Sequence, residues 1–151
     1  MIRLQEILVP VDFSTASDSA LHYGQAMAET FHARLHVLHV LEDSVLYGGL
    51  DPAPAEVRVE FERNARENLA KMLPAEVVRS LRAEFILKVG SPFVEIVRYA
   101  KEQGIDLVVL GTHGHGPIAH MLMGSVAERV VRKAPCPVLT VRHPEHEFVM
   151  P

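Results

Sequence analysis

The sequence predicts an α/β protein built on one open, five-stranded parallel sheet with helices on both faces, a Rossmann-like architecture. Five short runs rich in Val, Ile and Leu recur along the 151 residues. Several runs are almost continuously apolar rather than alternating, which is typical of parallel strands that are covered on both faces. Amphipathic helical patterns separate the runs, so the order β-α-β-α-β-α-β-α-β describes a single α/β domain.

The five predicted strands are short and contain few polar residues. They are EILVPV (6–11), RLHVLHVL (34–41), EFILKV (84–89), DLVVL (106–110) and PVLTVR (137–142). Pro135 and Pro137 flank the start of the last run, a position that suits the first residues of an edge strand. We therefore expect 137–142 to lie at an edge of the sheet.

The first two predicted helices carry apolar residues at spacings of three and four. Ser14 or Thr15 can cap the first helix. Its expected buried stripe is Ala16, Ala20, Tyr23, Met27 and Phe31. The second stripe is Val57, Phe61, Ala65, Leu69 and Met72. Pro74 is expected to end the second helix, because proline cannot continue a helical hydrogen-bond ladder.

The last two helices have recognisable start signals. Ser91 is a natural N-cap, Pro92 suits the first helical turn, and Gly104 suits the exit. In SVAERVVRKA, Ser125 and Glu128 have the spacing of a capping box. These signals place one helix over about residues 92–103 and another after residue 125.

Composition excludes several classes of function. The net charge of −4 and the pI of about 6.1 argue against a binder of duplex nucleic acid, for which a basic face is expected. No apolar run approaches the roughly 20 residues that span a bilayer, and Glu6 and Asp12 make the N-terminus unlike a signal peptide. Cys136 is the only cysteine, which suits a reducing compartment. We expect a cytoplasmic protein without nucleic-acid or membrane partners.

One domain is expected over residues 1–143, followed by a tail over 144–151. The stretch 42–54 is a long loop after the second strand, either a mobile excursion or a flap over a site. Cys136 is expected to be a small apolar filler in the core.

A binding site is expected at the carboxyl edge of the sheet, where the strand order reverses. The loops that diverge there are 10–14 and the glycine-rich stretch GTHGHGPIAHMLMGS (111–125). Glycines let the backbone approach a ligand, and a helix N-terminus supplies free N–H donors, so this stretch suits phosphate. Ser125 either caps its own helix or donates its hydroxyl to phosphate.

Two common phosphate motifs do not fit. The stretch lacks the Gly-Lys-Ser/Thr of a Walker A loop. GHGPIA (114–119) matches GxGxxA only weakly, since it follows the fourth strand rather than opening a first βαβ unit. The spacing of Gly111, Gly114, Gly124 and Ser125 instead reads G-x2-G-x9-G-[ST].

That spacing resembles the nucleotide-binding signature of the universal stress protein family. ILVPVDFS, HVLHV and APCPVLTVR are similar to the family's first, second and closing strands. The resemblance implies the strand order 3-2-1-4-5, a homodimer and ATP, or ADP or AMP, bound with a divalent ion that is expected to be Mg²⁺. It implies these binding residues: Pro10, Val11, Asp12, Val40, Gly111, Thr112, His113, Gly114, His115, Gly116, Gly124, Ser125 and Val126.

One position departs from the family pattern. The residue after Gly114 is often basic in the family and is His115 here, which gives phosphate less positive charge because an imidazole is mostly neutral above pH 7. The loop histidines His113, His115 and His120 lack Cys, Asp or Glu at ligand spacing, so we do not expect structural zinc. His36 and His39 are three apart in a strand and should face opposite sides.

The role of Asp12 stays open between capping the next turn and contacting nucleoside or metal. The edge strand 137–142 would be exposed unless it paired with its copy in a second subunit, in line with the homodimer that the resemblance implies. The sequence thus indicates a homodimeric ATP-binding stress-response module without an obvious general base. The alternatives are an adaptor of the same fold without nucleotide, or a slow phosphohydrolase or nucleotidyl transferase.

Overall fold

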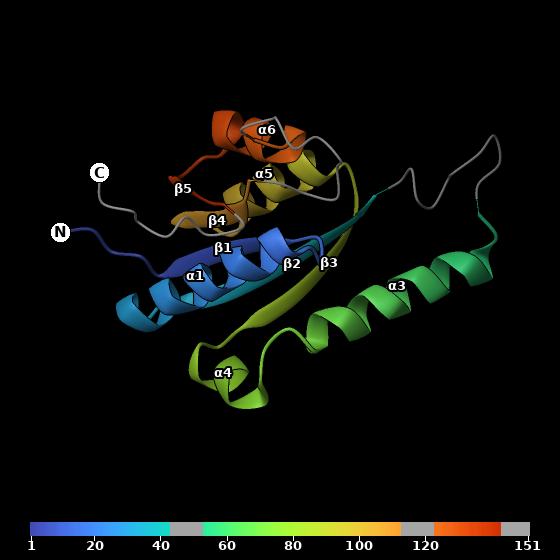
Figure 1. The fold of residues 1–151 in the computed structure, drawn as a ribbon, viewed down its shortest axis with the longest axis horizontal. Helices are drawn as coiled ribbons and strands as arrows, with labels where there is room; N and C mark the ends of the chain where they lie inside the picture. The colour runs from blue at the N-terminus through green and yellow to red at the C-terminus, as the bar shows by residue number, and fades with distance from the viewer. Residues whose placement is uncertain (43–52, 113–122, 143–151) are drawn as a thin grey trace, which may run out of the picture.

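The computed structural model describes residues 1–42, 53–112 and 123–142. Five parallel strands form one sheet in the order β3-β2-β1-β4-β5, so the predicted fold class and strand order are confirmed (Figure 1). The strands are β1 (Glu6–Val11), β2 (Arg34–Glu42), β3 (Glu84–Gly90), β4 (Leu107–Gly111) and β5 (Val138–Val141). Each lies within about one residue of its predicted range.

Helices cover both faces of the sheet. They are α1 (Thr15–Phe31), α3 (Ala55–Ala70), α4 (Ala75–Ser80), α5 (Pro92–Glu102) and α6 (Ser125–Lys133). One core contains Ile7 and Val9 of β1 and packs against α1 and α3. The other contains Leu8 of β1 and packs against α5 and α6. Alternate residues of the central strand therefore serve opposite cores, as expected for a parallel sheet buried on both sides.

The connection between α3 and β3 contains a helix that the sequence analysis missed. The second predicted helix ends at Ala70, before Pro74, and Pro74 becomes the N-cap of the short helix α4. A six-residue helix without a buried residue leaves no apolar stripe in the sequence. Helical periodicity therefore gave no signal for α4.

The predicted buried stripe of α1 is partly wrong. Tyr23 and Phe31 are exposed, whereas Gly24 and Ala28 face the sheet. A Cβ added to Gly24 would lie 2.3 Å from Cγ2 of Val9. At Gly24 the helix lies so close to the sheet that no side chain fits there, while Leu21 is buried in the core and Tyr23 and Phe31 turn outward.

The stripe predicted for α3 is buried only at its C-terminal end. Ala65 and Leu69 are buried, but Val57 and Phe61 are 38% and 40% exposed. Figure 1 shows the reason: the N-terminal half of α3 runs out past the β3 edge of the sheet. This half has no strand beneath it, so helical spacing alone overstated its burial.

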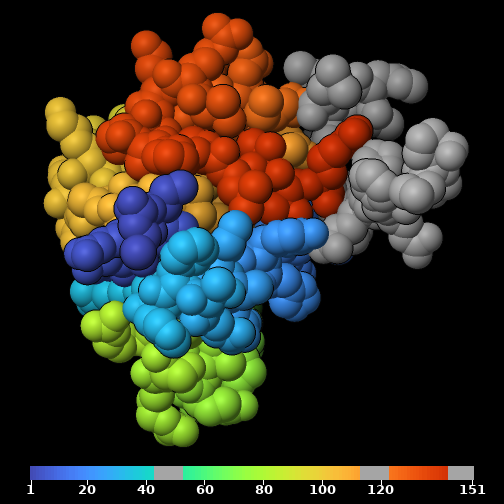
Figure 2. Space-filling model, turned by 90° about the vertical axis from the view of Figure 1, so that its left-hand side faces the viewer, coloured from blue at the N-terminus to red at the C-terminus, as the bar shows by residue number. Residues whose placement is uncertain are grey.

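The C-terminal elements and α4 lie at opposite ends of the face shown in Figure 2, with the light-blue α1 between them.

Cys136 is half-buried beside the core under α5 and α6, as predicted, and burial raises the pKa of its thiol. Across the described ranges, no helix is long and apolar enough to cross a membrane.

Candidate nucleotide site at the carboxyl edge

The central strands separate toward the carboxyl edge of the sheet. β1 pairs with β2 along its whole length, from Glu6 to Val11. With β4 it pairs only at Ile7 and Leu8. Pro10, further along β1, has no N–H to offer a ladder. β1 and β4 therefore part where the strand order reverses, which is where ligands bind in open α/β sheets.

The turn after β1 brings Asp12 to this edge and begins α1. Ser14 is the N-cap, since its Oγ accepts from the Ser17 N–H at 3.2 Å. Asp12 Oδ1 accepts from the Ser14 N–H at 3.0 Å and from the Ser14 hydroxyl. The capping role considered for Asp12 is thus present, and one carboxylate oxygen is held by the turn.

The two ends of the glycine-rich stretch are joined by their backbones. The Gly124 N–H donates to the Thr112 carbonyl at 2.5 Å, and the Thr112 N–H donates to the Val141 carbonyl at 2.9 Å. The start of α6 is thereby fixed beside the end of β4. Thr112 and Gly124 therefore lie side by side at the carboxyl edge.

Ser125 does not cap α6. The helix begins at Ser125, and Gly124 is the N-cap, without a side-chain cap bond among the described residues. The capping-box prediction for Ser125 and Glu128 is therefore wrong, because the box needs the hydroxyl residue one position earlier. The Ser125 hydroxyl and the first N–H groups of α6 remain as donors at the edge.

Comparison with known proteins shows the family to which the chain belongs. The sequence profile of the universal stress protein family matches residues 3–142. The chain belongs to the universal stress protein family. Universal stress protein MJ0577 of Methanocaldococcus jannaschii is 31% identical, over 93% of this chain and 96% of that protein.

Solved structures of universal stress proteins share the fold. UspA of Lactobacillus plantarum superposes with a TM-score of 0.79 at 30% identity, covering 94% of this chain and all of that one. A universal stress protein solved in complex with cAMP superposes with a TM-score of 0.60 at 27% identity, covering 93% of this chain and 98% of that one. The described strand order thus recurs in relatives across the whole domain.

Gly111 has a packing reason that the sequence did not reveal. A Cβ at this position would lie 2.8 Å from both the carbonyl carbon and oxygen of Ala16. The end of β4 therefore touches the backbone of the first turn of α1. In this universal stress protein, the first glycine of the signature lets β4 and α1 meet behind the site.

Val40 lies one residue beyond the last β1 partner. The β1–β2 register ends with Val11 opposite His39, while Val40 still pairs with Lys88 on β3. Its side chain is buried under α5. The backbone of Val40 thus borders the opening past the end of β1, the position expected for contact with a base.

The structure brings all nine described candidates to one edge. Those at the ends of β1, β2 and β4 and at the start of α6 are Pro10, Val11, Asp12, Val40, Gly111, Thr112, Gly124, Ser125 and Val126. His113, Gly114, His115 and Gly116 lie outside the described residues, as do His120, most of the 42–54 loop and the tail. Their roles stay predictions.

A buried polar network lies at the opposite, amino edge of this universal stress protein. His36 is 1% exposed; its Nε2 lies 2.6 Å from Glu6 Oε2 and its Nδ1 lies 2.8 Å from the Tyr99 hydroxyl. Arg34 pairs with Glu84, whose Oε2 is 4.0 Å from His36 Nδ1. His36 and His39 do face opposite sides, as predicted.

Burial, with the nearby Glu84 carboxylate adding to it, raises the pKa of Tyr99 to about 12. The phenol therefore keeps its proton at neutral pH and can donate to His36. Sequence reasoning missed this network, although a histidine within an apolar strand run was a usable signal. Both ring nitrogens of His36 have a partner, so the buried imidazole is satisfied. Arg34 Nε, by contrast, is buried without a hydrogen-bond partner among the described residues.

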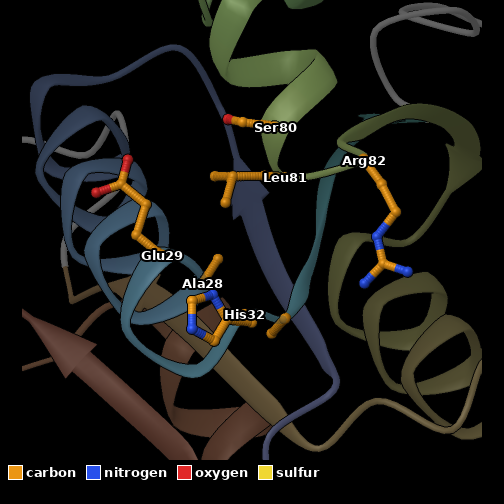
Figure 3. A pocket seen from close by; sticks show the side chains of 7 residues that line it. Ala28, Glu29, His32, Ser80, Leu81 and Arg82 are labelled. Atoms are coloured by element: carbon orange, nitrogen blue, oxygen red, sulfur yellow. The ribbon is translucent and has the colours of Figure 1, made fainter.

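A shallow cavity of about 380 Å³ also lies at the amino edge, between the end of α1 and α4. Figure 3 shows that its charged side chains do not converge, because Glu29 and Arg82 point away from one another. The cavity is far from the glycine-rich stretch in the fold, and its lining offers no set of groups aimed at one ligand.

Proposed function

We propose that this universal stress protein binds an adenine nucleotide, ATP in particular, at the carboxyl edge of its sheet. The observation that carries the proposal is the position of α6: the Gly124–Thr112 hydrogen bond fixes its N-terminus beside the carboxyl end of β4, the strand that separates from β1 after Leu8. A helix N-terminus of this kind binds phosphate through N–H groups and the helix dipole.

Two further observations favour an adenine nucleotide. A relative at 27% identity was solved in complex with cAMP. The spacing of Gly111, Gly114, Gly124 and Ser125 is that of the glycine signature, which by its resemblance to the family's nucleotide-binding signature favours ATP. In the proposed complex the base lies by Val40, and the phosphates lie by the start of α6.

A divalent ion fits this edge. The Asp12 carboxylate and the Ser125 hydroxyl are oxygen donors, the type that Mg²⁺ prefers. They would hold the ion together with water and phosphate oxygens, and the ion would neutralise phosphate charge. Removing Mg²⁺ with EDTA should therefore weaken ATP binding more than AMP binding.

The proposed role is that of a cytoplasmic, homodimeric regulatory module rather than a fast enzyme. The only described carboxylate at the end of β1 is Asp12. Its Oδ1 accepts from Ser14, and in the proposed complex the carboxylate also holds Mg²⁺, so it is not left to take a proton from an attacking water. Turnover of ATP well above background would favour the hydrolase alternative.

The test is to denature the freshly purified protein and identify any released nucleotide by mass spectrometry. We expect ATP, ADP or AMP in a substantial fraction of the molecules. A nucleotide-free protein that also fails to take up added ATP would favour the adaptor alternative.

A further inference from the structure

We propose that His39 is a positioning residue for the nucleotide site: through the Val11 carbonyl and the Phe13 ring, it holds the turn that presents Asp12. This inference rests on the proposed nucleotide function and deepens it. His39 lies on β2 and was considered in the sequence only as a metal-ligand candidate. Its side-chain hydrogen bond and its ring contact both lead to the turn after β1.

The first contact is with the end of β1. His39 Nδ1 lies 2.8 Å from the Val11 carbonyl oxygen. A carbonyl oxygen can only accept, so Nδ1 must carry the proton and donate. The bond fixes the tautomer and the orientation of the ring. It also ties the last residue of β1 to β2 at the point where the β1–β2 register ends.

The second contact is with Phe13. Its backbone is left-handed, with φ of 63°, a conformation that a residue with a bulky side chain rarely adopts. The Phe13 side chain offers no hydrogen bond that could compensate. Its ring lies 4.4 Å from the His39 ring, centroid to centroid, at an interplanar angle of 39°. The imidazole therefore packs against the strained residue of the turn.

Asp12 lies between these two anchored residues. His39 holds Val11 on one side and Phe13 on the other, while the Asp12 N–H donates to Ser17 Oγ at 3.3 Å. The position of the Asp12 carboxylate is thus set jointly by β2 and by the first turn of α1. Loosening His39 should let the turn relax toward an ordinary backbone conformation and move Asp12 out of place.

Three substitutions separate the two contacts. His39→Asn keeps an N–H donor near the Val11 carbonyl but loses the ring. His39→Phe keeps the ring but loses the donor, and His39→Ala loses both. The matched control is His22→Ala, an exposed histidine on α1. Each variant is checked by circular dichroism and then titrated calorimetrically with ATP and Mg²⁺.

We expect His39→Ala to raise the Kd about tenfold, and His39→Asn and His39→Phe each to recover part of that loss. Hydrogen exchange gives a second readout, because the Ser14 N–H is bonded to Asp12 Oδ1. It should exchange about tenfold faster in folded His39→Ala than in the parent or in His22→Ala. If His39 only filled space, its loss would not change both the Kd for ATP and the exchange rate of the Ser14 N–H.

Folded His39→Ala with parental ATP affinity and parental Ser14 protection would overturn the inference while leaving the nucleotide function standing. A parent that binds no adenine nucleotide would overturn the proposed function, and the site role of His39 with it. The two failures are thus distinguished by the parent titration alone.

Discussion

At the scale of single residues, two glycines that look alike in the sequence, Gly111 and Gly104, have different physical roles. Gly111 is glycine because a Cβ would strike the Ala16 backbone, whereas Gly104 is glycine because its φ is 61° in open space. The sequence predicted Gly104 as a helix exit correctly. It assigned Gly111 only to the ligand, because contact with a helix nearly a hundred positions earlier leaves no local pattern.

Substitutions at these two glycines should therefore respond in opposite ways to side-chain size. Gly111→Ala should lower the free energy of unfolding by about 1–3 kcal/mol through overpacking, and Gly111→Asn should cost more. At Gly104, Asn should cost less than Ala, since asparagine tolerates the left-handed conformation. Urea denaturation of the four variants checks this; equal costs for Ala and Asn at Gly111 would contradict the packing role.

Ser14 and Ser125 both looked like helix caps in the sequence, but their substitution should affect different properties of the protein. Ser14 caps α1, so Ser14→Ala should lower the free energy of unfolding by about 1 kcal/mol. Ser125 is the first residue of α6 and not its cap, so Ser125→Ala should change stability by less than about 0.5 kcal/mol. It should instead weaken ATP binding several-fold. A stability loss in Ser125→Ala equal to that in Ser14→Ala would restore the cap assignment.

At the scale of elements, strands were predictable and helix faces were less so. Buried parallel strands are apolar on both sides, so their runs stand out in the sequence. For α1, the close approach to the sheet at Gly24 leaves Tyr23 and Phe31 of the predicted stripe on the outer face. For α3, position relative to the sheet edge decided burial. Both depend on where a helix sits, which periodicity does not encode.

The contact between α5 and β2 gives a prediction that depends on pH. Tyr99→Phe removes the hydroxyl beside His36 Nδ1 and should lower the free energy of unfolding by about 1–3 kcal/mol at pH 7. The folded-state pKa of Tyr99 is about 12, above the unfolded value of 10.0. The unfolded chain therefore loses this proton first, and the stabilisation is complete below pH 10 and lost between pH 10 and 12.

Urea midpoints measured for the parent and Tyr99→Phe from pH 8 to 11 check this prediction. The gap between the two proteins should be constant up to about pH 9 and then shrink. Using the difference removes the contribution of other tyrosines and lysines. A gap that widens above pH 10 would show that the Tyr99 phenolate is favoured in the folded state.

At the scale of the whole molecule, β5 offers a test of the proposed homodimer. The carbonyls of Pro137 and Val141 accept from the N–H groups of Val108 in β4 and of Thr112, the residue after β4. Main-chain groups alternate sides along a strand, so Leu139 also bonds toward β4, while the Thr140 N–H points to the outer edge. Thr140 is exposed, and a change there spares the ladder within the subunit.

Thr140→Pro removes that outward donor and should shift the protein from dimer to monomer in sedimentation velocity. Thr140→Val, which keeps the donor, is the control and should stay dimeric. Leu139 is unsuitable for this purpose, because proline there would break the β4–β5 ladder. A parent that is monomeric at micromolar concentration would contradict pairing through β5.

ATP binding at the carboxyl edge is the central proposal, and calorimetric titration of nucleotide-stripped protein with ATP and Mg²⁺ tests it directly. Gly114, a signature residue outside the described ranges, supplies the matched variant. We predict saturable binding of about one ATP per chain to the parent and none to Gly114→Val, because a β-branched side chain would block the close approach of the backbone to phosphate that the glycine-rich stretch is predicted to allow. Absence of binding to the folded parent, or parental affinity in Gly114→Val, would contradict ATP binding at the glycine-rich stretch.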